Sequence, residues 1–421
     1  MTINQIINNF KENNPKADTD MIQLAYDFAV KAHAGQKRKS GEPYIQHCLH
    51  TAFVLVQIKA DLETVIAGLL HDIPEDTEFT LKDIEKNFGK EVADLVEGIT
   101  KLSKIKYRGI ERYRESLRKM FLAMAQDLRV ILIKFADRLH NLRTLDSLPL
   151  EKRQRIARET LEIYAPIAGL LGIWRLKWQM EDICFKHLYP EDYKKLAYKY
   201  EVEKKLEHNQ YIQKTKNMLG VKLKEAKIPF HITSRFKHLY SIYLKLRKKD
   251  RKFDEIYDVF ALRIIVPDIA DCYKTLGIIH SLWRPNPGRF KDYVAVPKPN
   301  GYQALHTTVY GPEGKSTEFQ IRTKEMDEIA KYGIASHWSY KMDSGKGGDQ
   351  KKQPPWVKEV LNIQKETEDT SDFIKQIKFD VFHDRIFIFT PKGDVFDLPE
   401  GSTPIDFAYY VHSDVGNQAV G

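Results

Sequence analysis

A histidine and three carboxylates follow closely on the apolar run VIAGLL: they are His71, Asp72, Glu75 and Asp76 in HDIPED. The apolar run predicts a buried helix, so the His-Asp doublet lies at its inner end. An imidazole beside a carboxylate there is a candidate pair of metal ligands. The other two acids come about one turn later and face the same place. A carboxylate beside a metal can position a water or take its proton for attack on phosphorus.

A metal at this doublet needs ligands from other helices. His47 in GEPYIQHCLH and Asp137 in IKFADRLHNL lie in helix-like segments with apolar neighbours, where an unpaired carboxylate is costly to bury. With His71 and Asp72 they make a set of two histidines and two aspartates, which suits Mn²⁺, and also Fe or Zn. A lone His-Asp pair is more often a helix cap or a satisfied polar pair, so it is the whole ordered set that favours a metal site.

Cations dominate a second stretch, RFKHLYSIYLK, which we expect to be helical. Arg235, Lys237, Ser241 and Lys245 would then share one stripe, and cations at this spacing can bind a triphosphate. The stretch belongs to 222–252, which holds 11 Lys and Arg against two acids in a chain of formal net charge +9. Such a segment suits polyphosphate or nucleic acid. The alternative is a solvated helix face.

Two carboxylates on predicted strands could complete this second site. Asp258 opens one strand and Glu318 lies in another, and such a pair can hold Mg²⁺ against phosphates while one member accepts a hydroxyl proton. Taken alone, Glu318 is better explained as an edge-strand charge, and Tyr302 as a packing residue rather than a platform for a base. The groups around the neighbouring Pro-Asn-Gly turn are Lys291, Lys298, Tyr302 and His306.

The elements that must position these groups change in character along the chain. Up to about residue 200, apolar residues recur at helical spacing, as in 21–33 and 91–102. The region from about 205 to 341 mixes strand and helix patterns, which predicts an α+β domain. Strands are predicted at 258–266, 305–311 and 316–321, helices at 272–283 and 325–338, a Gly-, Lys- and Pro-rich linker at 341–355, and a hairpin with a Pro-Lys-Gly-Asp turn at 384–398.

Composition excludes several classes of protein. The 421 residues are enough for two or three domains, and 42% are hydrophobic, so each domain can bury a core. There is no apolar run of ~18 residues to span a membrane, and the polar N-terminus is not a signal peptide. The cysteines Cys48, Cys184 and Cys272 are too scattered for a disulfide framework or a CxxC metal site. We therefore expect a soluble, cytoplasmic protein with no membrane partner.

The first site resembles a known family. GQKRKSGEPYIQH, HDIPEDT and FADRLHNLRTL are similar to the hydrolase domain of the bifunctional RelA/SpoT homologues (the Rel family), whose HD-type metal site removes the 3′-diphosphate from the alarmone (p)ppGpp. Synthetase-only relatives lack the HDxxED stretch, so its presence implies active hydrolysis. Cys48 stands where relatives often have proline, which should alter the local backbone more than the chemistry. The resemblance implies Mn²⁺ ligands at His47, His71, Asp72 and Asp137, catalytic acids at Glu75 and Asp76, and substrate contacts at Lys37, Arg38 (against guanine), Lys39 and Asn141.

The second site resembles the synthetase domain of the same family, a relative of polymerase-β-type nucleotidyltransferases. That domain transfers the β,γ-diphosphate of ATP to the 3′-OH of GDP or GTP. The resemblance implies Mg²⁺ at Asp258 and Glu318, with Glu318 also as the base, and stacking of the acceptor guanine on Tyr302. The other implied substrate contacts are Arg235 and Arg263 at adenine, Lys237, Ser241 and Lys245 at ATP phosphates, His306 at acceptor phosphates, and Lys291, Lys298, Gln320 and Arg322 around the site.

The tail from 379 resembles the start of a TGS domain, a β-grasp module that contacts tRNA on the ribosome. It is too short to close a core, so we expect a piece of a longer protein, whose partners include the ribosome and uncharged tRNA. The expected layout is an all-α HD-type hydrolase domain at 1–150, a helical linker at 151–204, an α+β nucleotidyltransferase-like synthetase domain at 205–341, a linker and helix at 342–378, and a partial TGS domain at 379–421.

Three functions compete. The favoured hypothesis is a bifunctional enzyme that makes and destroys (p)ppGpp. A second hypothesis keeps hydrolysis alone beside a decayed synthetase half, although the candidate synthetase residues are all present. A third, from another class, is a ribosome- or tRNA-binding regulator without turnover, whose positive charge serves RNA. Metal-dependent turnover by the purified protein separates the third hypothesis from the first two.

Overall fold

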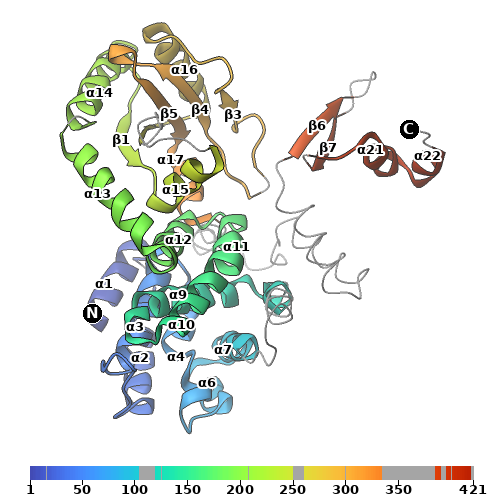
Figure 1. Ribbon diagram of the computed structural model, residues 1–421. Coiled ribbons are helices and arrows are strands. Elements are labelled where there is room, and N and C mark those ends of the chain that lie inside the picture. The colour runs from blue at the N-terminus through green and yellow to red at the C-terminus, as the bar shows by residue number, and fades with distance from the viewer. Residues whose placement is uncertain are drawn as a thin grey trace. The chain divides into compact units, whose positions relative to one another are not determined.

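The computed structural model describes residues 1–15, 17–103, 119–124, 126–206, 208–249, 260–298, 300–333, 385–389, 395–399 and 401–418. The chain divides into two compact units. One comprises Met1–Lys104 and Asp127–Gly348, and the other comprises Ile105–Gln126 and Asp349–Gly421. The first unit contains a helical part followed by a five-stranded sheet with its own helices (Figure 1).

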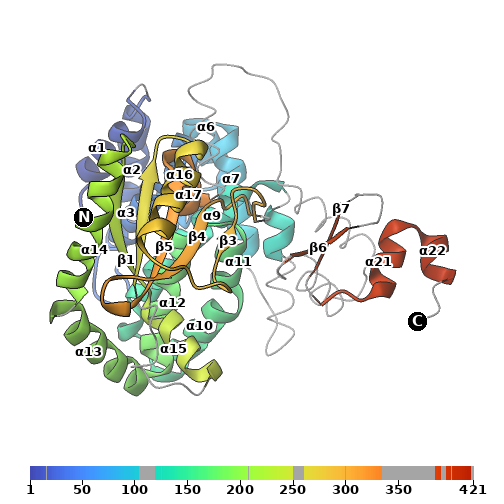
Figure 2. The ribbon, with the colours of Figure 1, turned by 90° about the horizontal axis from the view of Figure 1, so that it is seen from above.

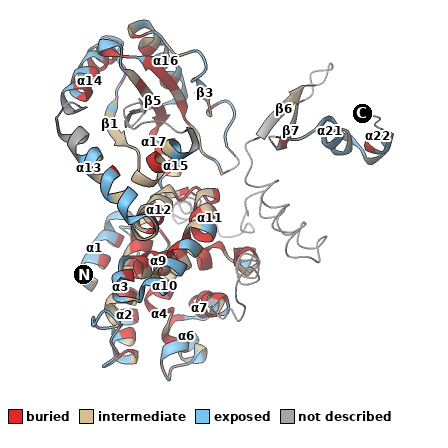
Figure 3. Ribbon diagram, in the orientation of Figure 1, coloured by how far each residue is buried: buried red, intermediate tan, exposed pale blue. Residues whose placement is uncertain are grey.

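The helical part is built around three helices, α3, α4 and α9. Every residue of α4 from Thr64 to Leu70 is buried, and Asp61 caps this helix by accepting a hydrogen bond from the Thr64 amide at 2.8 Å. Buried residues gather along α4 and α9 (Figure 3). The helices are α1 (Ile3–Asn13), α2 (Asp20–Ala32), α3 (Ile45–Gln57), α4 (Leu62–Leu70), α5 (Ile73–Asp76), α6 (Leu81–Phe88), α7 (Lys90–Ser103) and α9 (Leu128–Arg143), with a short 3-10 turn at Leu145–Ser147.

A run of helices then connects the helical part with the sheet. Among them, α12 packs against α9 and α10 on the helical side, and against α15 and α17 on the sheet side. Helix α12 therefore packs against both the helical part and the sheet part. These helices are α10 (Leu150–Glu159), a π-helical turn (Thr160–Tyr164), α11 (Ala165–Leu170), α12 (Trp174–Leu188), α13 (Pro190–Leu206) and α14 (His208–Glu225).

The sheet has the order β1-β2-β5-β4-β3, in which β2 and β5 are parallel and the other neighbours antiparallel. Figure 2 shows β1, β5, β4 and β3 following one another across the sheet. The expected α+β domain is confirmed. Its elements are β1 (His231–Phe236), α15 (Leu239–Lys249), β2 (Phe260–Val266), α16 (Ile269–Leu282), β3 (Lys291–Asp292), β4 (Leu305–Tyr310), β5 (Ser316–Thr323) and α17 (Lys324–Tyr332).

Alternation along the strands separates a core face from a polar face. Successive side chains of a strand point to opposite faces of its sheet. On β5, Phe319 and Ile321 join the apolar core with residues of α14 and α16, so the alternate residues Glu318, Gln320 and Arg322 face the other way. This register brings the polar residues of several strands to one face.

The expected helical stripe in RFKHLYSIYLK is wrong in part. Arg235 lies in β1, which pairs with β2, and the helix α15 begins only at Leu239. Pairing with β2 satisfies the backbone groups of HITSRF, and it overrides the helical spacing of the cations. Ser241 and Lys245 do share a helix.

The second unit contains the hairpin that the sequence predicts near its end. The strands β6 (Arg385–Phe389) and β7 (Val395–Pro399) pair antiparallel, and the helices α21 (Pro404–Val411) and α22 (Ser413–Gln418) follow. The predicted Pro-Lys-Gly-Asp turn, the linker at 341–355 and Asp258 lie outside the described residues. Among the helices described, none is long and apolar enough to cross a membrane.

Candidate active sites

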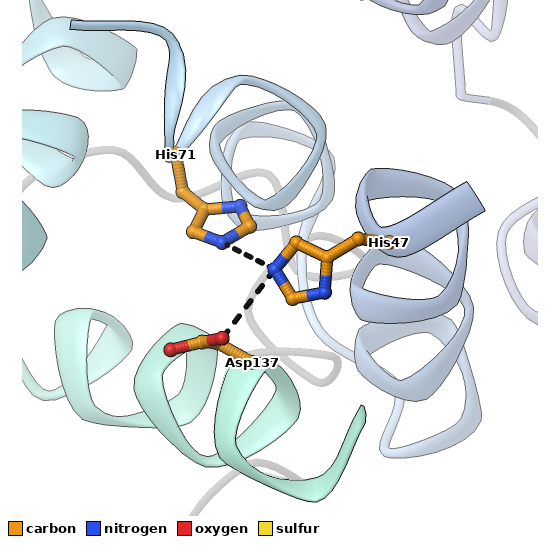
Figure 4. A group of neighbouring side chains, drawn as sticks. All are labelled: His47, His71 and Asp137. Atoms are coloured by element: carbon orange, nitrogen blue, oxygen red, sulfur yellow. Dashed lines mark hydrogen bonds and ion pairs between the residues drawn. The ribbon is translucent and has the colours of Figure 1, made fainter. Parts of the chain in front are cut away.

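Three helices bring a predicted metal-ligand group together. His47 comes from α3, His71 ends α4, and Asp137 comes from α9; all three are buried, and their ligand atoms lie within 4.8 Å of one another (Figure 4). The Nε2 atom of His47 is 3.2 Å from Nε2 of His71 and 3.4 Å from Oδ1 of Asp137. Residues far apart in the sequence thus converge on one point in the helical core.

Neighbouring groups orient both imidazoles. The Nδ1 atom of His71 lies 2.9 Å from the Gly68 carbonyl, which can only accept, so Nδ1 carries a proton and Nε2 faces the group, where it can bind a metal once it has lost its own proton. The Nδ1 atom of His47 is 2.8 Å from Nδ1 of His140, so its Nε2 likewise faces the group. Gly68 also lets α4 approach α3, because a Cβ there would lie 2.4 Å from Leu55 Cδ1.

The fourth predicted ligand, Asp72, lies beside this group, with Oδ2 3.3 Å from His47 Nε2 and 3.2 Å from His71 Nε2. Burial alone would raise the pKa of the Asp72 carboxyl, but charge on His71 and hydrogen bonds from both histidines hold it well below its usual value. Burial also opposes ionisation of Asp137, yet Lys134, at 3.0 Å, and His47 keep its pKa far below normal. Two ionised carboxylates and two imidazoles fit a divalent cation.

The predicted acid pair follows in the short helix α5. Glu75 and Asp76 are both exposed. The hydroxyl of Tyr44 lies 2.6 Å from Asp76 Oδ2 and 2.8 Å from Asp72 Oδ2, and its ring stacks on His33 with centroids 4.5 Å apart. Tyr44 therefore links the acid pair to the group of candidate ligands.

The predicted nucleotide contacts of this site lie on the same side. Arg38 donates a hydrogen bond to the side-chain oxygen of Asn141, and Asn141 in turn donates to Asp137 Oδ1 at 2.5 Å. The structure thus places Arg38 and Asn141 next to the candidate ligands. Lys37 and Lys39 are exposed beside them, where they can reach solvent-borne phosphates.

Tyr44 and His140 were missed by the sequence analysis. Tyr44 precedes His47 by three residues, and His140 follows Asp137 by three, a spacing that places residues on one face of a helix. His140 also lies 3.2 Å from an Arg38 guanidinium nitrogen. Burial and the nearby His47 lower the pKa of His140 to about 2, so it stays neutral and can serve as a hydrogen-bonding partner.

The second candidate site is a cavity of about 540 Å³ over the polar face of the sheet. Most of the predicted synthetase residues line it, which brings together groups from β1, α15, β4, β5 and the turn before β4. Ser241 and Arg263 are outside this lining, and Asp258 is not among the described residues. The predicted residues that line it are Arg235, Lys237, Lys245, Lys291, Lys298, Tyr302, His306, Glu318, Gln320 and Arg322.

Glu318 is the carboxylate of this cavity. Its Oε2 lies 3.6 Å from Lys237 Nζ, its Oε1 lies 3.6 Å from His306 Nδ1, and Gln320 donates to Oε1 at 3.0 Å. Burial would raise the pKa of Glu318, but the nearby His306 and the charge of Lys237 hold it far below its usual value. Glu318 is therefore an ionised group, as a Mg²⁺ ligand must be, and it is in the unprotonated form that a proton acceptor needs.

Tyr302 lies in a network at the floor of the cavity. Its hydroxyl is 2.8 Å from His306 Nε2, and Arg322 donates to it at 3.2 Å. The Arg322 guanidinium also lies 5.4 Å from the Tyr302 ring centroid. These contacts fix the orientation of the ring, which favours a stacking platform over a mobile surface tyrosine.

Three arginines, Arg235, Arg263 and Arg322, lie close to one another and to Tyr302. Asp327 of α17, which is 2% exposed, pairs with Arg263 at 3.4 Å and with Arg322 at 3.5 Å. Burial and the charge of Arg322 lower the pKa of Arg263 to about 10, and burial, partly offset by Tyr302, also lowers the pKa of Arg235. Two carboxylates, Asp327 and Glu318, are outnumbered here by cationic groups, which makes an anionic ligand such as a polyphosphate favourable.

Several residues of this site were not predicted from the sequence. Trp174 of α12 and Tyr293 line the cavity, although the helical linker carried no predicted site residue. Asp327 has no motif of its own, and only its burial beside two arginines indicates its role.

Comparisons with known proteins identify domains over the regions that contain the two candidate sites. An HD domain model matches residues 25–174, a model for a region found in RelA/SpoT proteins matches 234–345, and a TGS domain model matches 386–421. A GTP pyrophosphokinase of Myxococcus xanthus is 47% identical over 97% of this chain, and the bifunctional (p)ppGpp synthase/hydrolase SpoT of Escherichia coli K12 is 47% identical over 100% of it. The chain spans 54% and 60% of the lengths of these two relatives.

Solved structures match parts of the chain. A metazoan orthologue of SpoT, described as hydrolysing ppGpp, is 25% identical and is matched over 97% of its length and 41% of this chain, with a TM-score of 0.32. A small alarmone synthetase of Bacillus subtilis is 27% identical and is matched over 93% of its length and 39% of this chain, with a TM-score of 0.27.

Proposed function

The chain belongs to the RelA/SpoT family, and from this premise we propose that it both makes and hydrolyses (p)ppGpp. The observation that carries the proposal is that two groups of candidate site residues each come together within one chain. The His47, His71 and Asp137 group converges in the helical part, while Glu318 and Tyr302 line a cation-rich cavity over the sheet. A hydrolase with a decayed synthetase half would not require the second arrangement.

For hydrolysis, His47, His71, Asp72 and Asp137 would hold a divalent ion, which we propose to be Mn²⁺. When bound, such an ion polarises a phosphoryl oxygen and makes water more acidic. Glu75 and Asp76, exposed beside this group, would orient the attacking water and accept its proton. Attack breaks the bond between the ribose 3′-oxygen and phosphorus and releases pyrophosphate.

Substrate recognition at this site would use the polar groups beside Asp137. Arg38, held by Asn141, would pack against guanine, and the exposed Lys37 and Lys39 would attract the phosphates. The metal group would then face the 3′-diphosphate. A hydrogen-bonded guanidinium is well suited to stack on a planar base.

For synthesis, the 3′-hydroxyl of GDP or GTP would attack the β-phosphorus of ATP, and AMP would leave. Glu318, ionised in the cavity, would accept the hydroxyl proton and, with Asp258, hold Mg²⁺. Tyr302 would stack on the acceptor base, with His306 at its phosphates. The groups proposed to bind ATP are Arg235 and Arg263 at the base, Lys237, Ser241 and Lys245 at the phosphates, with Lys291, Lys298, Gln320 and Arg322 close by.

We propose the domain layout 1–150, 151–204, 205–341, 342–378 and 379–421 for these functions. The match of a TGS model to residues 386–421 supports ribosome and uncharged tRNA as partners. These partners would regulate the enzyme and would not be needed for its basal chemistry.

A direct assay tests the proposal. The purified chain is incubated with ATP, GDP and Mg²⁺, and separately with ppGpp and Mn²⁺, and nucleotides are separated chromatographically. We expect ppGpp and AMP in the first reaction, and GDP and pyrophosphate in the second. Product in the second alone supports the hydrolase-only hypothesis, and no turnover in either supports a binding regulator.

A further inference from the structure

The helix α15 is anchored to the connecting helices and not to the sheet. Its residues Ile242 and Tyr243 share an apolar cluster with Phe185 of α12 and Leu196 of α13. The sheet core is a separate cluster, and none of the α15 residues described in the structure belongs to it. The position of α15 over the cavity is therefore set by α12 and α13.

Two polar contacts from α12 hold the start of α15. Asp182 Oδ1 accepts a hydrogen bond from the Tyr240 amide at 2.9 Å, and Trp178, one turn earlier, stacks on His238 with centroids 4.2 Å apart and planes 1° apart. The first amides of a helix have no partner within the helix. The side chain of His238, the residue that precedes α15, stacks on Trp178. The hydrogen bond to the Tyr240 amide is instead accepted by Asp182 of α12.

The environment of Asp182 is unfavourable for an ionised carboxylate. Burial raises the pKa of Asp182 to about 6, even though backbone hydrogen bonds from Tyr240 and Leu239 favour its ionised form. A partly buried carboxylate with an unfavourable environment and a specific amide partner is better explained by a positioning role than by general solubility.

The residues proposed to hold the ATP phosphates lie on this capped segment. Ser241 is in the first turn of α15, and Lys245 lies one turn later and lines the cavity. Arg235 and Lys237, also in the lining, precede the helix, and Arg235 is fixed by strand pairing. The sheet thus fixes one end of this segment, and α12 fixes the other.

We propose that Asp182 is a positioning residue for ATP: through its cap, α12 sets where Ser241 and Lys245 meet the phosphates. This inference rests on the proposed synthetase function. Under this proposal, α12, which lies outside the sheet, helps to position the residues that bind ATP. The proposal also predicts different effects on the two substrates. Tyr302 and Glu318, which we propose to act on the acceptor nucleotide, lie on the sheet side and do not depend on the cap from Asp182.

Steady-state synthesis by the purified chain tests the inference, with ATP varied at saturating GDP and GDP varied at saturating ATP. For Asp182→Ala we expect the KM for ATP to rise about fivefold or more, in line with the loss of a helix cap, and the KM for GDP to stay within about twofold. Asp182→Asn should restore a near wild-type KM for ATP, because its amide oxygen can still accept from the Tyr240 amide.

Gln179→Ala is the matched control. It removes another hydrogen-bonded polar side chain of α12, but one that accepts from Arg143 in the helical part at 2.7 Å, so the KM for ATP should not change. Hydrolysis of ppGpp by each variant reports on folding in the same chain. Should Asp182→Ala not fold, Asp182→Ser takes its place, since serine is polar but too short to reach Tyr240.

The outcomes separate the two proposals. Absence of synthesis by the wild-type chain overturns the proposed synthetase function, and this inference with it. Synthesis by the wild type together with an unchanged KM for ATP in the alanine or serine variant overturns the inference alone. Equal rises in the KM for ATP and for GDP also overturn it, because they indicate a general structural role.

Discussion

The hydroxyl of Tyr44 lies 2.6 Å from Oδ2 of Asp76. The same hydroxyl is 2.8 Å from Asp72, so a phenol with a single proton faces two carboxylates. If Asp72 binds a cation, the Tyr44 hydroxyl would donate its hydrogen bond to Asp76 alone. This hydrogen bond would hold Asp76 in place beside the candidate metal ligands. Tyr44 is thereby placed to orient the acid that we propose to handle the attacking water.

Replacing Tyr44 tests this arrangement. Tyr44→Phe keeps the ring that stacks on His33 but removes the hydroxyl, and we expect kcat for ppGpp hydrolysis to fall about tenfold, as for a lost hydrogen bond to a charged group. Metal content and ppGpp synthesis should not change. A hydrolysis rate within twofold of the wild type would show that Asp76 is oriented without Tyr44.

The metal group and the acid pair should be separable by mutation. His71→Ala should abolish both bound metal and hydrolysis, whereas Glu75→Gln combined with Asp76→Asn should keep the metal but lower turnover by at least ~10². Metal is measured by elemental analysis of the dialysed protein, and His231→Ala, on an exposed strand position, is the control. Near wild-type hydrolysis by the double variant would remove the acid pair from the mechanism.

Glu318→Gln should nearly eliminate synthesis. The substitution removes an ionised carboxylate that we propose as both Mg²⁺ ligand and proton acceptor. Hydrolysis should persist, which is measured in the same preparation. Glu313→Gln, at an exposed turn before β5, provides a matched control that should synthesise normally. Synthesis by Glu318→Gln at a tenth of the wild-type rate or more would argue against a proton acceptor at this position.

Tyr302→Ala should weaken binding of the acceptor nucleotide more than binding of ATP. A lost base–aromatic stack is worth ~1–3 kcal/mol. The measurement is the KM for GDP against the KM for ATP, with Tyr310→Ala, an exposed tyrosine on β4, as control. If the KM for GDP is unaltered, Tyr302 has only the packing role that its contacts with Arg322 and His306 describe.

The two sites should influence each other, because opposite reactions in one chain would otherwise consume ATP in a futile cycle. The helical and sheet parts touch directly: Lys59, after α3, pairs with Glu328 of α17 at 3.0 Å, and Gly172 packs on Gly333. Only glycine fits at Gly333, where φ is +57° and a Cβ would lie 2.3 Å from a backbone oxygen. We expect nucleotide in the synthetase site to lower ppGpp affinity at the hydrolase site about 5- to 150-fold, with a reciprocal effect.

Coupling is measured as ppGpp affinity of the Glu75→Gln, Asp76→Asn variant, with and without GDP plus a non-transferable ATP analogue. A parallel variant with Tyr302→Ala in addition controls for ppGpp binding in the synthetase cavity. Equal affinities within error would mean that the sites act independently in this chain.

The sequence by itself determined many of the elements and the candidate residues of both sites. Helical periodicity to about residue 200, the three strands with their helices, and the ordered set His47, His71, Asp72 and Asp137 were all accessible, because local spacing reflects which face of an element is buried. Three of these four residues, His47, His71 and Asp137, converge on one point, and each comes from a helix with apolar neighbours.

Only the tertiary structure decided where the chain turns and which elements share a site. The break between β1 and α15 depends on pairing with β2, and no local pattern in RFKHLYSIYLK encodes it. Trp174 lines the synthetase cavity, Asp182 contacts the start of α15, and Asp327 pairs with Arg322, all through contacts between distant segments. Tyr44 reaches Asp76 in the same way. Such contacts follow from the packing of whole helices and sheets, which periodicity constrains only to a buried face and not to a particular partner.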